Sequence, residues 1–352
     1  MSPEDGLTIT SVEVMLRQYP AINPPYRWRN GLPGSDPEYT GAWLAITTAS
    51  GVTGYAPCVR GVIVQDIVDR RIRREILGID ALRREYLWER LWEIDRVEEL
   101  PLYVLGLVDM AVWDIAAKAA GLPLHKLLGS YRDSIPAYAS TATFGSIAEY
   151  LDVADQCKEL GYTALKLHAW GDVREDAALG AALRSHLGDD YPLMYDGSAG
   201  FDLSDAVYLG RALGNEGFLW YEEPMREFSI SAYKRLAEKV EIPLLVAETS
   251  DGVHMNTADF IVSGAASAVR TSSGLKGGIT GAMRIAHLAD SFLMRAEVHG
   301  GGPANAHLCM AISNTTYYES FVGSNPVKRE AAVGNDGQLR PPTGPGIGWS
   351  PE

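Results

Sequence analysis

The chain has 352 residues, a formal net charge of −14 and a pI near 5.0, with 46% hydrophobic and 22% charged residues. This acidity excludes generic binding to nucleic acids or anionic membranes, because both need a basic surface. No apolar run approaches the roughly 18 residues of a membrane span, and the N-terminus lacks the basic and apolar regions of a signal peptide. We therefore expect a cytoplasmic protein. Three scattered cysteines fit neither a disulfide framework nor a metal finger: Cys58, Cys157 and Cys309.

Residues 1–130 have the pattern of a separate α+β capping domain, in which β-like runs at 7–16 and 42–56 precede long helical stretches. Between the two runs, residues 19–41 are rich in proline, glycine and aromatic residues. Loops of this length are commonly functional lids or disordered segments. The arginine and aromatic content favours a lid, and four of its residues are candidate substrate contacts: Tyr26, Arg27, Trp28 and Arg29.

Residues 131–325 alternate short β-rich runs with amphipathic helical patterns that end in glycine. Eight such runs occur, at 135–141, 163–169, 192–197, 218–224, 243–249, 268–273, 293–299 and 316–321. Eight parallel strands joined by helices predict a closed (β/α)8, or TIM-type, barrel. The tail, residues 326–352, is rich in proline and glycine and is expected to pack on the capping domain.

Three of the predicted strands end in carboxylates: Asp196, Glu222 and Glu248, spaced 26 residues apart each time. One βα unit separates each from the next, so they are expected side by side at the carboxyl ends of neighbouring strands. Taken singly, each could be a helix N-cap or a solvated loop residue. Together they would repel one another without a cation, and a hard divalent ion prefers oxygen ligands. The pattern predicts a Mg²⁺ site.

On the strand before these, Lys166 and His168 point to the same face, because side chains alternate along a strand. A buried ammonium must lie beside carboxylates, a metal or a bound anion. His168 is either a substrate contact or a hydrogen-bonded polar residue at the barrel mouth. Glu223, next to Glu222, points away from the predicted metal and is assigned a supporting role.

Several of these motifs together resemble one family. The helical segment 106–129, the lysine motif, the series Asp196, "EEP", Glu248, and "GGIT" (277–280) followed by His299 are similar to the enolase superfamily in its mandelate racemase subgroup. The resemblance implies a capping domain, a modified barrel and a Mg²⁺ ion held by Asp196, Glu222 and Glu248. It also implies removal of the proton α to a substrate carboxylate, with the metal stabilising the enediolate. Homo-oligomers from dimers to octamers are implied as well.

The resemblance assigns roles to three further residues. Lys166 would be a base, if burial and nearby positive charge lower its pKa; the alternative is a purely structural ion pair with Asp196. His299, across the ring, would be the acid or base for the opposite face of the substrate. Glu319 matches a position that donates a hydrogen bond to the enolic oxygen, for which it must be protonated.

The sequence departs from the subgroup at two places. Ser272 stands five residues before the Gly-Gly pair, where an aspartate normally orients the histidine. His299 is therefore expected to have a lowered pKa, unless a local shift brings Arg270 or Lys276 near the site. Ser272 joins His168 and the lid as a candidate substrate contact. The Lys-x-His pair also replaces the commoner Lys-x-Lys.

The preferred function is Mg²⁺-dependent dehydration of a sugar acid to a 2-keto-3-deoxy acid. The first alternative is a racemase or epimerase of a 2-hydroxy or related carboxylic acid, which would use bases on both faces of the substrate. The second is a homologue that binds metal and ligand but has lost catalysis.

Overall fold

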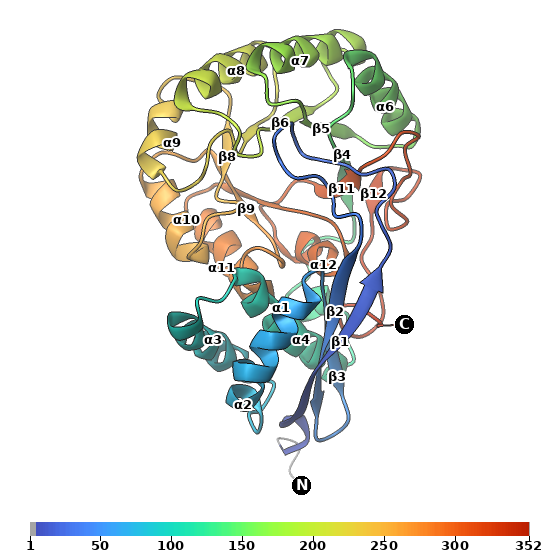
Figure 1. The fold of residues 1–352 in the computed structure, drawn as a ribbon, viewed down its shortest axis with the longest axis vertical. Coiled ribbons are helices and arrows are strands. Elements are labelled where there is room, and N and C mark those ends of the chain that lie inside the picture. The colour runs from blue at the N-terminus through green and yellow to red at the C-terminus, as the bar shows by residue number, and fades with distance from the viewer. Residues whose placement is uncertain (1–4, 352) are drawn as a thin grey trace.

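The computed structural model describes residues 5–351. A short 3₁₀ helix (Asp5–Leu7) leads into an antiparallel three-stranded sheet of β1 (Ile9–Tyr19), β2 (Tyr39–Thr48) and β3 (Thr53–Cys58), in that spatial order. The long ribbon of β1 and β2 stands beside the helices at the lower end of the molecule (Figure 1). The run predicted at 42–56 is divided between β2 and β3, because the chain turns at Gly51, whose φ is +84°.

Helices follow the sheet: α1 (Gly61–Ile67), a π-helical turn (Val68–Ile72), α2 (Arg73–Ile76), α3 (Arg84–Glu98), α4 (Leu102–Ala119) and α5 (Leu124–Leu127). The continuous helix expected over 106–129 is wrong in extent. It ends at Ala119, since Gly121 takes a φ of +68° and Pro123 cannot continue the hydrogen-bonding pattern. The remaining residues form the separate short helix α5.

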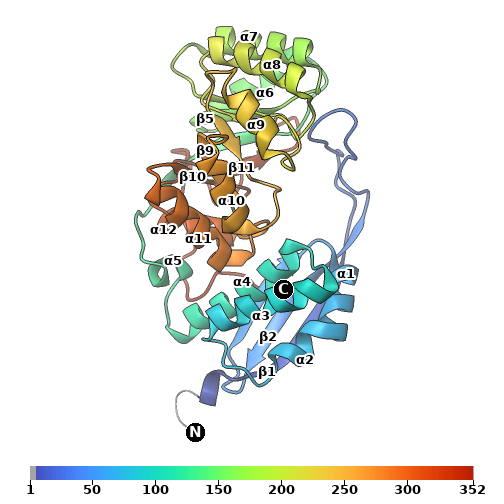
Figure 2. The same ribbon diagram turned by 90° about the vertical axis from the view of Figure 1, so that its left-hand side faces the viewer.

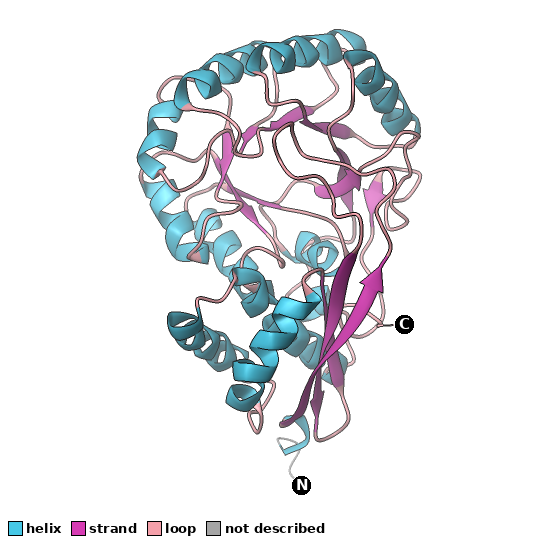
Figure 3. Ribbon diagram, in the orientation of Figure 1, coloured by secondary structure: helices cyan, strands magenta, loops and turns pink. Residues whose placement is uncertain are grey.

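The eight predicted barrel strands are all present: β4 (Ile135–Thr141), β5 (Ala164–His168), β6 (Leu193–Asp196), β7 (Tyr221–Glu222), β8 (Leu244–Val246), β9 (Ala268–Thr271), β10 (Arg295–Val298) and β11 (Tyr318–Val322). They run parallel in the order β10-β9-β8-β7-β6-β5-β4-β11, and β12 (Gln338–Leu339) pairs antiparallel with β4. Within residues 5–351 no ladder joins β10 to β11. The sheet curls into the TIM-type barrel that the alternating pattern predicted (Figure 3).

Seven helices surround this sheet: α6 (Ile147–Glu159), α7 (Val173–Leu187), α8 (Leu203–Asn215), α9 (Ile230–Ala237), α10 (Val253–Val262), α11 (Gly278–Ser291) and α12 (Pro303–Ala311). Side chains that accept backbone N–H groups begin four of them: Ser146, Asp172, Asp202 and Ser229. The helices form an outer layer around the strands (Figure 1).

A buried carboxylate connects α4 to the barrel helix α11. Asp109 accepts the backbone N–H of Thr280 at 2.9 Å and its hydroxyl at 2.6 Å. A Cβ on Gly278 would lie 2.3 Å from Asp109 Oδ2, so only glycine permits this approach. Trp88 of α3 adds a hydrogen bond from Nε1 to the Gly277 carbonyl at 2.9 Å. The "GGIT" motif therefore anchors the amino-terminal helices against the barrel (Figure 2).

Two segments reach between these parts of the chain. The loop between β1 and β2 extends to the strand ends of the barrel (Figures 1 and 2). In the tail, the N–H of Ile347 donates to Asp114 of α4 at 2.7 Å. The domain boundaries near 130 and 325 stay predictions. Among the described helices, none is long and apolar enough to cross a membrane.

Candidate active site

The carboxylates predicted from the sequence gather at the carboxyl ends of β6, β7 and β8. Strand register sets His168 beside Asp196 and Asp196 beside Glu222, and Glu248 follows two residues after β8. The backbone next to two of them is unusual, because Glu223 has a φ of 37° and Ala247 a φ of 67°. Non-glycine residues in this region are strained and are typical of functional sites.

Lys166 is completely buried and contacts three carboxylates. Its Nζ lies 3.2 Å from Asp196, 3.1 Å from Glu222 and 2.8 Å from Glu319. Burial alone lowers the pKa of Lys166, but Glu222 and Glu319 outweigh it and raise this pKa well above its ordinary value. The expectation of a lowered pKa is therefore wrong for this arrangement. Lys166 also has three carboxylate partners, more than the single ion pair with Asp196 that was considered as the alternative.

His168 lies between the carboxylate of Asp196 and the lid residue Trp28. Its Nε2 is 3.0 Å from Asp196, and its Nδ1 is 2.6 Å from the carbonyl oxygen of Thr141. The ring of Trp28 packs on the imidazole with 4.6 Å between centroids. His168 is thus held on both ring nitrogens and covered by an aromatic side chain.

Arg270 enters the ring from β9, which the site prediction had considered only through a shift of register. Its NH2 donates to Glu222 at 2.8 Å and to the Tyr138 hydroxyl at 2.9 Å, and its Nε makes a further, shorter contact with Glu222. It also lies 3.4 Å from Glu319. Side chains alternate along a strand, so Arg270 lies on the same face as Ser272. This spacing is the sequence signal that could have predicted Arg270 in the site.

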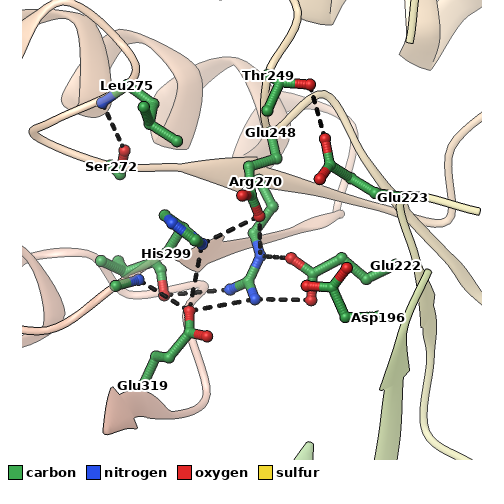
Figure 4. Close-up of polar contacts among 12 residues, drawn as sticks. Asp196, Glu222, Glu223, Glu248, Thr249, Arg270, Ser272, Leu275, His299 and Glu319 are labelled. Atoms are coloured by element: carbon green, nitrogen blue, oxygen red, sulfur yellow. Dashed lines mark hydrogen bonds and ion pairs between the residues drawn. The ribbon is translucent and has the colours of Figure 1, made fainter. Parts of the chain in front are cut away.

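His299 follows β10 and faces two carboxylates. Its Nδ1 is 3.0 Å from Glu248 and 3.3 Å from Glu319 (Figure 4). Burial acts to lower the pKa of His299, but these two carboxylates raise it to about 10. The expectation of a lowered pKa is wrong, since Glu248 and Glu319 supply the negative charge that the aspartate position lacks. Ser272 instead accepts the Leu275 N–H at 3.0 Å, turned away from His299 (Figure 4).

Glu319 connects the two candidate acid/base groups. Its Oε1 contacts Lys166, and its Oε2 contacts His299 and accepts the Gly300 N–H at 2.8 Å. Burial would raise the pKa of Glu319, but Lys166 and Arg270 hold it well below its ordinary range. These contacts favour the ionised form of Glu319, against the protonated donor that was expected.

The lid residues take different positions. Tyr26 and Trp28 pack on Phe321 with centroid distances of 4.7 and 4.9 Å. Arg29 donates from Nε to the Ser198 carbonyl at 3.1 Å, which ties the lid to the loop after β6. The side chain of Arg27 is exposed, and only its carbonyl bonds to the barrel, accepting the N–H of Thr143 at 2.9 Å.

The ring brings together three side chains that could ligate a metal ion. One ligand atom each from Glu222, Glu248 and His299 lies within 4.8 Å of the others. Glu248 Oε2 is buried and accepts no well-aligned hydrogen bond, although the cationic groups His299 Nδ1 and Arg270 Nε lie 3.0 and 3.7 Å from it. Asp196 lies next to this set on β6. Its oxygens contact side chains or backbone of three residues, Lys166, His168 and Ser198. The metal set Asp196, Glu222 and Glu248 stays a prediction.

The parallel barrel, the capping domain and the acidic strand ends agree with the enolase-like class that the motifs resemble. The family model described as "Enolase C-terminal domain-like" matches residues 149–352. The model "Mandelate racemase / muconate lactonizing enzyme, N-terminal domain" matches residues 35–129. The chain belongs to the mandelate racemase and muconate lactonizing enzyme family of the enolase superfamily, which confirms the resemblance read from its motifs.

Similar proteins include enzymes of known activity. The D-glucarate dehydratase of Agrobacterium tumefaciens, solved with magnesium, is 31% identical with a TM-score of 0.87, over 97% of this chain and 96% of the other. A racemase from Streptomyces coelicolor with bound magnesium is 26% identical with a TM-score of 0.83, over 97% and 96%. The L-talarate/galactarate dehydratase of Salmonella typhimurium is 28% identical, over 78% of this chain and 69% of the relative.

Proposed function

We propose that this chain is a Mg²⁺-dependent lyase that dehydrates a sugar acid to a 2-keto-3-deoxy acid. The reaction class follows the family and the dehydratases named above. For this chain, the contact of one carboxylate with two candidate proton-transfer groups supports transfer of the α-proton, and the similarity to dehydratases favours loss of the β-hydroxyl over racemisation. Glu319 lies 2.8 Å from Lys166 on β5 and 3.3 Å from His299 after β10, on well-separated strands of the ring.

Dehydration requires removal of the α-proton and departure of the β-hydroxyl. In this proposal Asp196 and Glu222 are neutralised by the bound divalent cation, which lowers the raised pKa of Lys166. The neutral amine of Lys166 then takes the proton from the α-carbon, giving an enediolate. The bond from the β-carbon to oxygen then breaks, and His299 gives its proton to the departing hydroxide, forming water. The resulting enol becomes the 2-keto acid. The carboxylates of Glu248 and Glu319 beside the imidazole favour the protonated form that this step needs.

Asp196, Glu222 and Glu248 are the proposed holders of the cation. A bound divalent ion would offset the charge that builds up on the substrate carboxylate and compete with the Lys166 ammonium for the same oxygens. Glu319 and Arg270 would then hold Lys166, His299 and Glu222 in place around the substrate. His168 and the lid residues Trp28, Tyr26, Arg27 and Arg29 are proposed to contact its hydroxyls and distal end. Ser272 is not kept as a contact, because it is buried and bonded to Leu275.

A racemase is the second candidate, favoured by the placement of Lys166 and His299 on separated strands around one carboxylate. In that reaction one group would remove the α-proton and the other would return a proton to the opposite face. Loss of the β-hydroxyl distinguishes the two reactions.

The test is incubation with Mg²⁺ and a panel of aldaric and aldonic acids in deuterated water. We expect a 2-keto-3-deoxy acid from at least one substrate, detected by NMR or as its semicarbazone. Deuterium exchange with inversion at the α-carbon and no keto acid would support the racemase. Ligand-induced thermal stabilisation with neither product would indicate the lapsed homologue. Cytoplasmic location and homo-oligomerisation remain hypotheses, the second tested by light scattering.

A further inference from the structure

Glu227 is a buried glutamate whose hydrogen bonds hold the loop that carries Glu248. Glu227 lies in the loop after β7 and is only 4% exposed. Its carboxylate accepts the backbone N–H groups of Thr249 at 2.8 Å and Ser250 at 3.2 Å, and makes a shorter contact with the N–H of Ala247. Three backbone N–H groups of this loop therefore donate to the same carboxylate.

These amides lie on both sides of Glu248 in the sequence, so Glu227 fixes the backbone from which Glu248 projects. Hydrogen bonds to an ionised carboxylate are stronger than those between neutral groups. They offset the strain of Ala247, whose φ of 67° is unfavourable for a residue with a side chain. Without this grip, we expect the loop to relax and Glu248 to lose its fixed direction.

Two further contacts secure the same loop. The Thr249 hydroxyl donates to Glu223 at 2.7 Å (Figure 4). From the other side, Lys276 donates from Nζ to the Ser250 carbonyl at 2.7 Å and is 1% exposed. Lys276 brings a buried positive charge close to Glu227, which makes the burial of this carboxylate tolerable. Glu223, which follows β7, and Lys276, which follows β9, thus both hold the loop after β8.

We propose that Glu227 is a positioning residue that holds Glu248 in the direction needed to bind the divalent cation. This inference rests on the proposed function, in which Glu248 is a ligand of the ion. Glu227 is not one of the proposed ligands of the ion, since its carboxylate is bonded to backbone N–H groups. Residues that orient metal ligands in this way typically change metal affinity by 10–100-fold when mutated.

The test is calorimetric titration of the full chain with Mg²⁺, and with Mn²⁺ as a second probe. Glu227→Gln removes two of the acceptor positions and the charge, and we expect Mg²⁺ to bind about 10–100-fold more weakly. Glu227→Asp keeps the charge but withdraws the carboxylate by one methylene. We expect it to weaken binding about 10-fold, which separates positioning from a simple effect of charge.

Glu297→Gln is the matched control. Glu297 of β10 is also buried, but its carboxylate accepts the N–H of Thr316 at 3.0 Å, just before β11 begins. We expect it to lower thermal stability and leave the Mg²⁺ affinity unchanged. Wild-type affinity in Glu227→Asp overturns the inference while leaving the proposed function intact, and this variant decides if Glu227→Gln does not fold. A wild type that binds neither ion overturns the proposed function, and the inference with it.

Discussion

Arg270 holds both carboxylate oxygens of Glu222. NH2 donates to Oε2 at 2.8 Å, and Nε contacts Oε1 more closely. Oε2 also faces Lys166 at 3.1 Å and Trp220 Nε1 at 3.3 Å, so its lone pairs are fully used. Oε1 therefore remains the oxygen through which Glu222 can bind a cation.

Arg270→Met is expected to destabilise the fold strongly, because it leaves the buried Glu222 with only Lys166 as a charged partner. Removal of one member of a buried ion pair typically costs about 3–5 kcal/mol. Urea unfolding at pH 7 measures this loss. Arg340→Met, which breaks the exposed pair with Asp336, serves as the control and should leave the midpoint unchanged. A small effect of Arg270→Met would show that the charges around Glu222 rearrange freely.

His299→Asn is expected to lower kcat for keto-acid formation by about 10²–10⁴-fold, because Asn cannot give a proton to the leaving hydroxide. The measurement is the initial rate on the substrate found in the panel, with Mg²⁺ affinity recorded in parallel. His186→Asn changes an exposed histidine paired with Asp155 and should retain full activity. Full turnover by His299→Asn would remove this residue from the mechanism.

Trp28→Ala tests the lid. The indole packs on His168 and Phe321, and aromatic contacts of this kind are worth about 0.5–1.5 kcal/mol, so we expect KM to rise up to about 10-fold with kcat nearly unchanged. Steady-state kinetics separate the two constants. Tyr131→Ala, at an exposed tyrosine, is the control. An unaltered KM would exclude the lid from substrate binding.

Asp109 predicts a pH dependence of stability. Burial raises the pKa of Asp109 from 3.8 to about 7, against the opposing hydrogen bonds from Thr280. The folded state therefore binds this proton more tightly than the unfolded state. Its contribution to stability is complete below about pH 4 and is lost as the pH rises through 7, on the order of 4 kcal/mol at most.

Asp109→Asn should therefore gain stability relative to the wild type between pH 5 and 8, as measured by urea unfolding across this range. Burial also raises the pKa of Asp176, to about 6. The unfolding free energy of Asp109→Asn should therefore still fall with rising pH, but less steeply than that of the wild type. For Asp190→Asn, at an exposed site, the curve of unfolding free energy against pH should run parallel to that of the wild type. Parallel curves for Asp109→Asn would mean that Asp109 stays ionised in the folded state.

The strands were predictable because a local pattern specifies them. Alternation of β-rich and helical segments identified all eight barrel strands, and the regular spacing of Asp196, Glu222 and Glu248 placed them on neighbours. The helix expected over 106–129 was wrong in extent, since the apolar pattern continues through Gly121 and Pro123 while the backbone does not.

The protonation states could not be predicted, because they depend on partners distant in sequence. Lys166 and His299 share Glu319, which comes from the last barrel strand. Arg270 reaches Glu222 across 48 residues, and Glu227 grips a loop more than 20 residues away. Such pairings depend on how the ring closes, and a single sequence does not show it.

The most direct test of the account is a crystal structure of the chain grown with Mn²⁺, using anomalous scattering to locate the ion. We expect one peak among Asp196, Glu222 and Glu248, within about 2.0–2.3 Å of an oxygen from each and absent after chelation with EDTA. Carboxylates that still face only Lys166, Arg270 and His299, with no anomalous peak at saturating Mn²⁺, would contradict the metal-dependent mechanism.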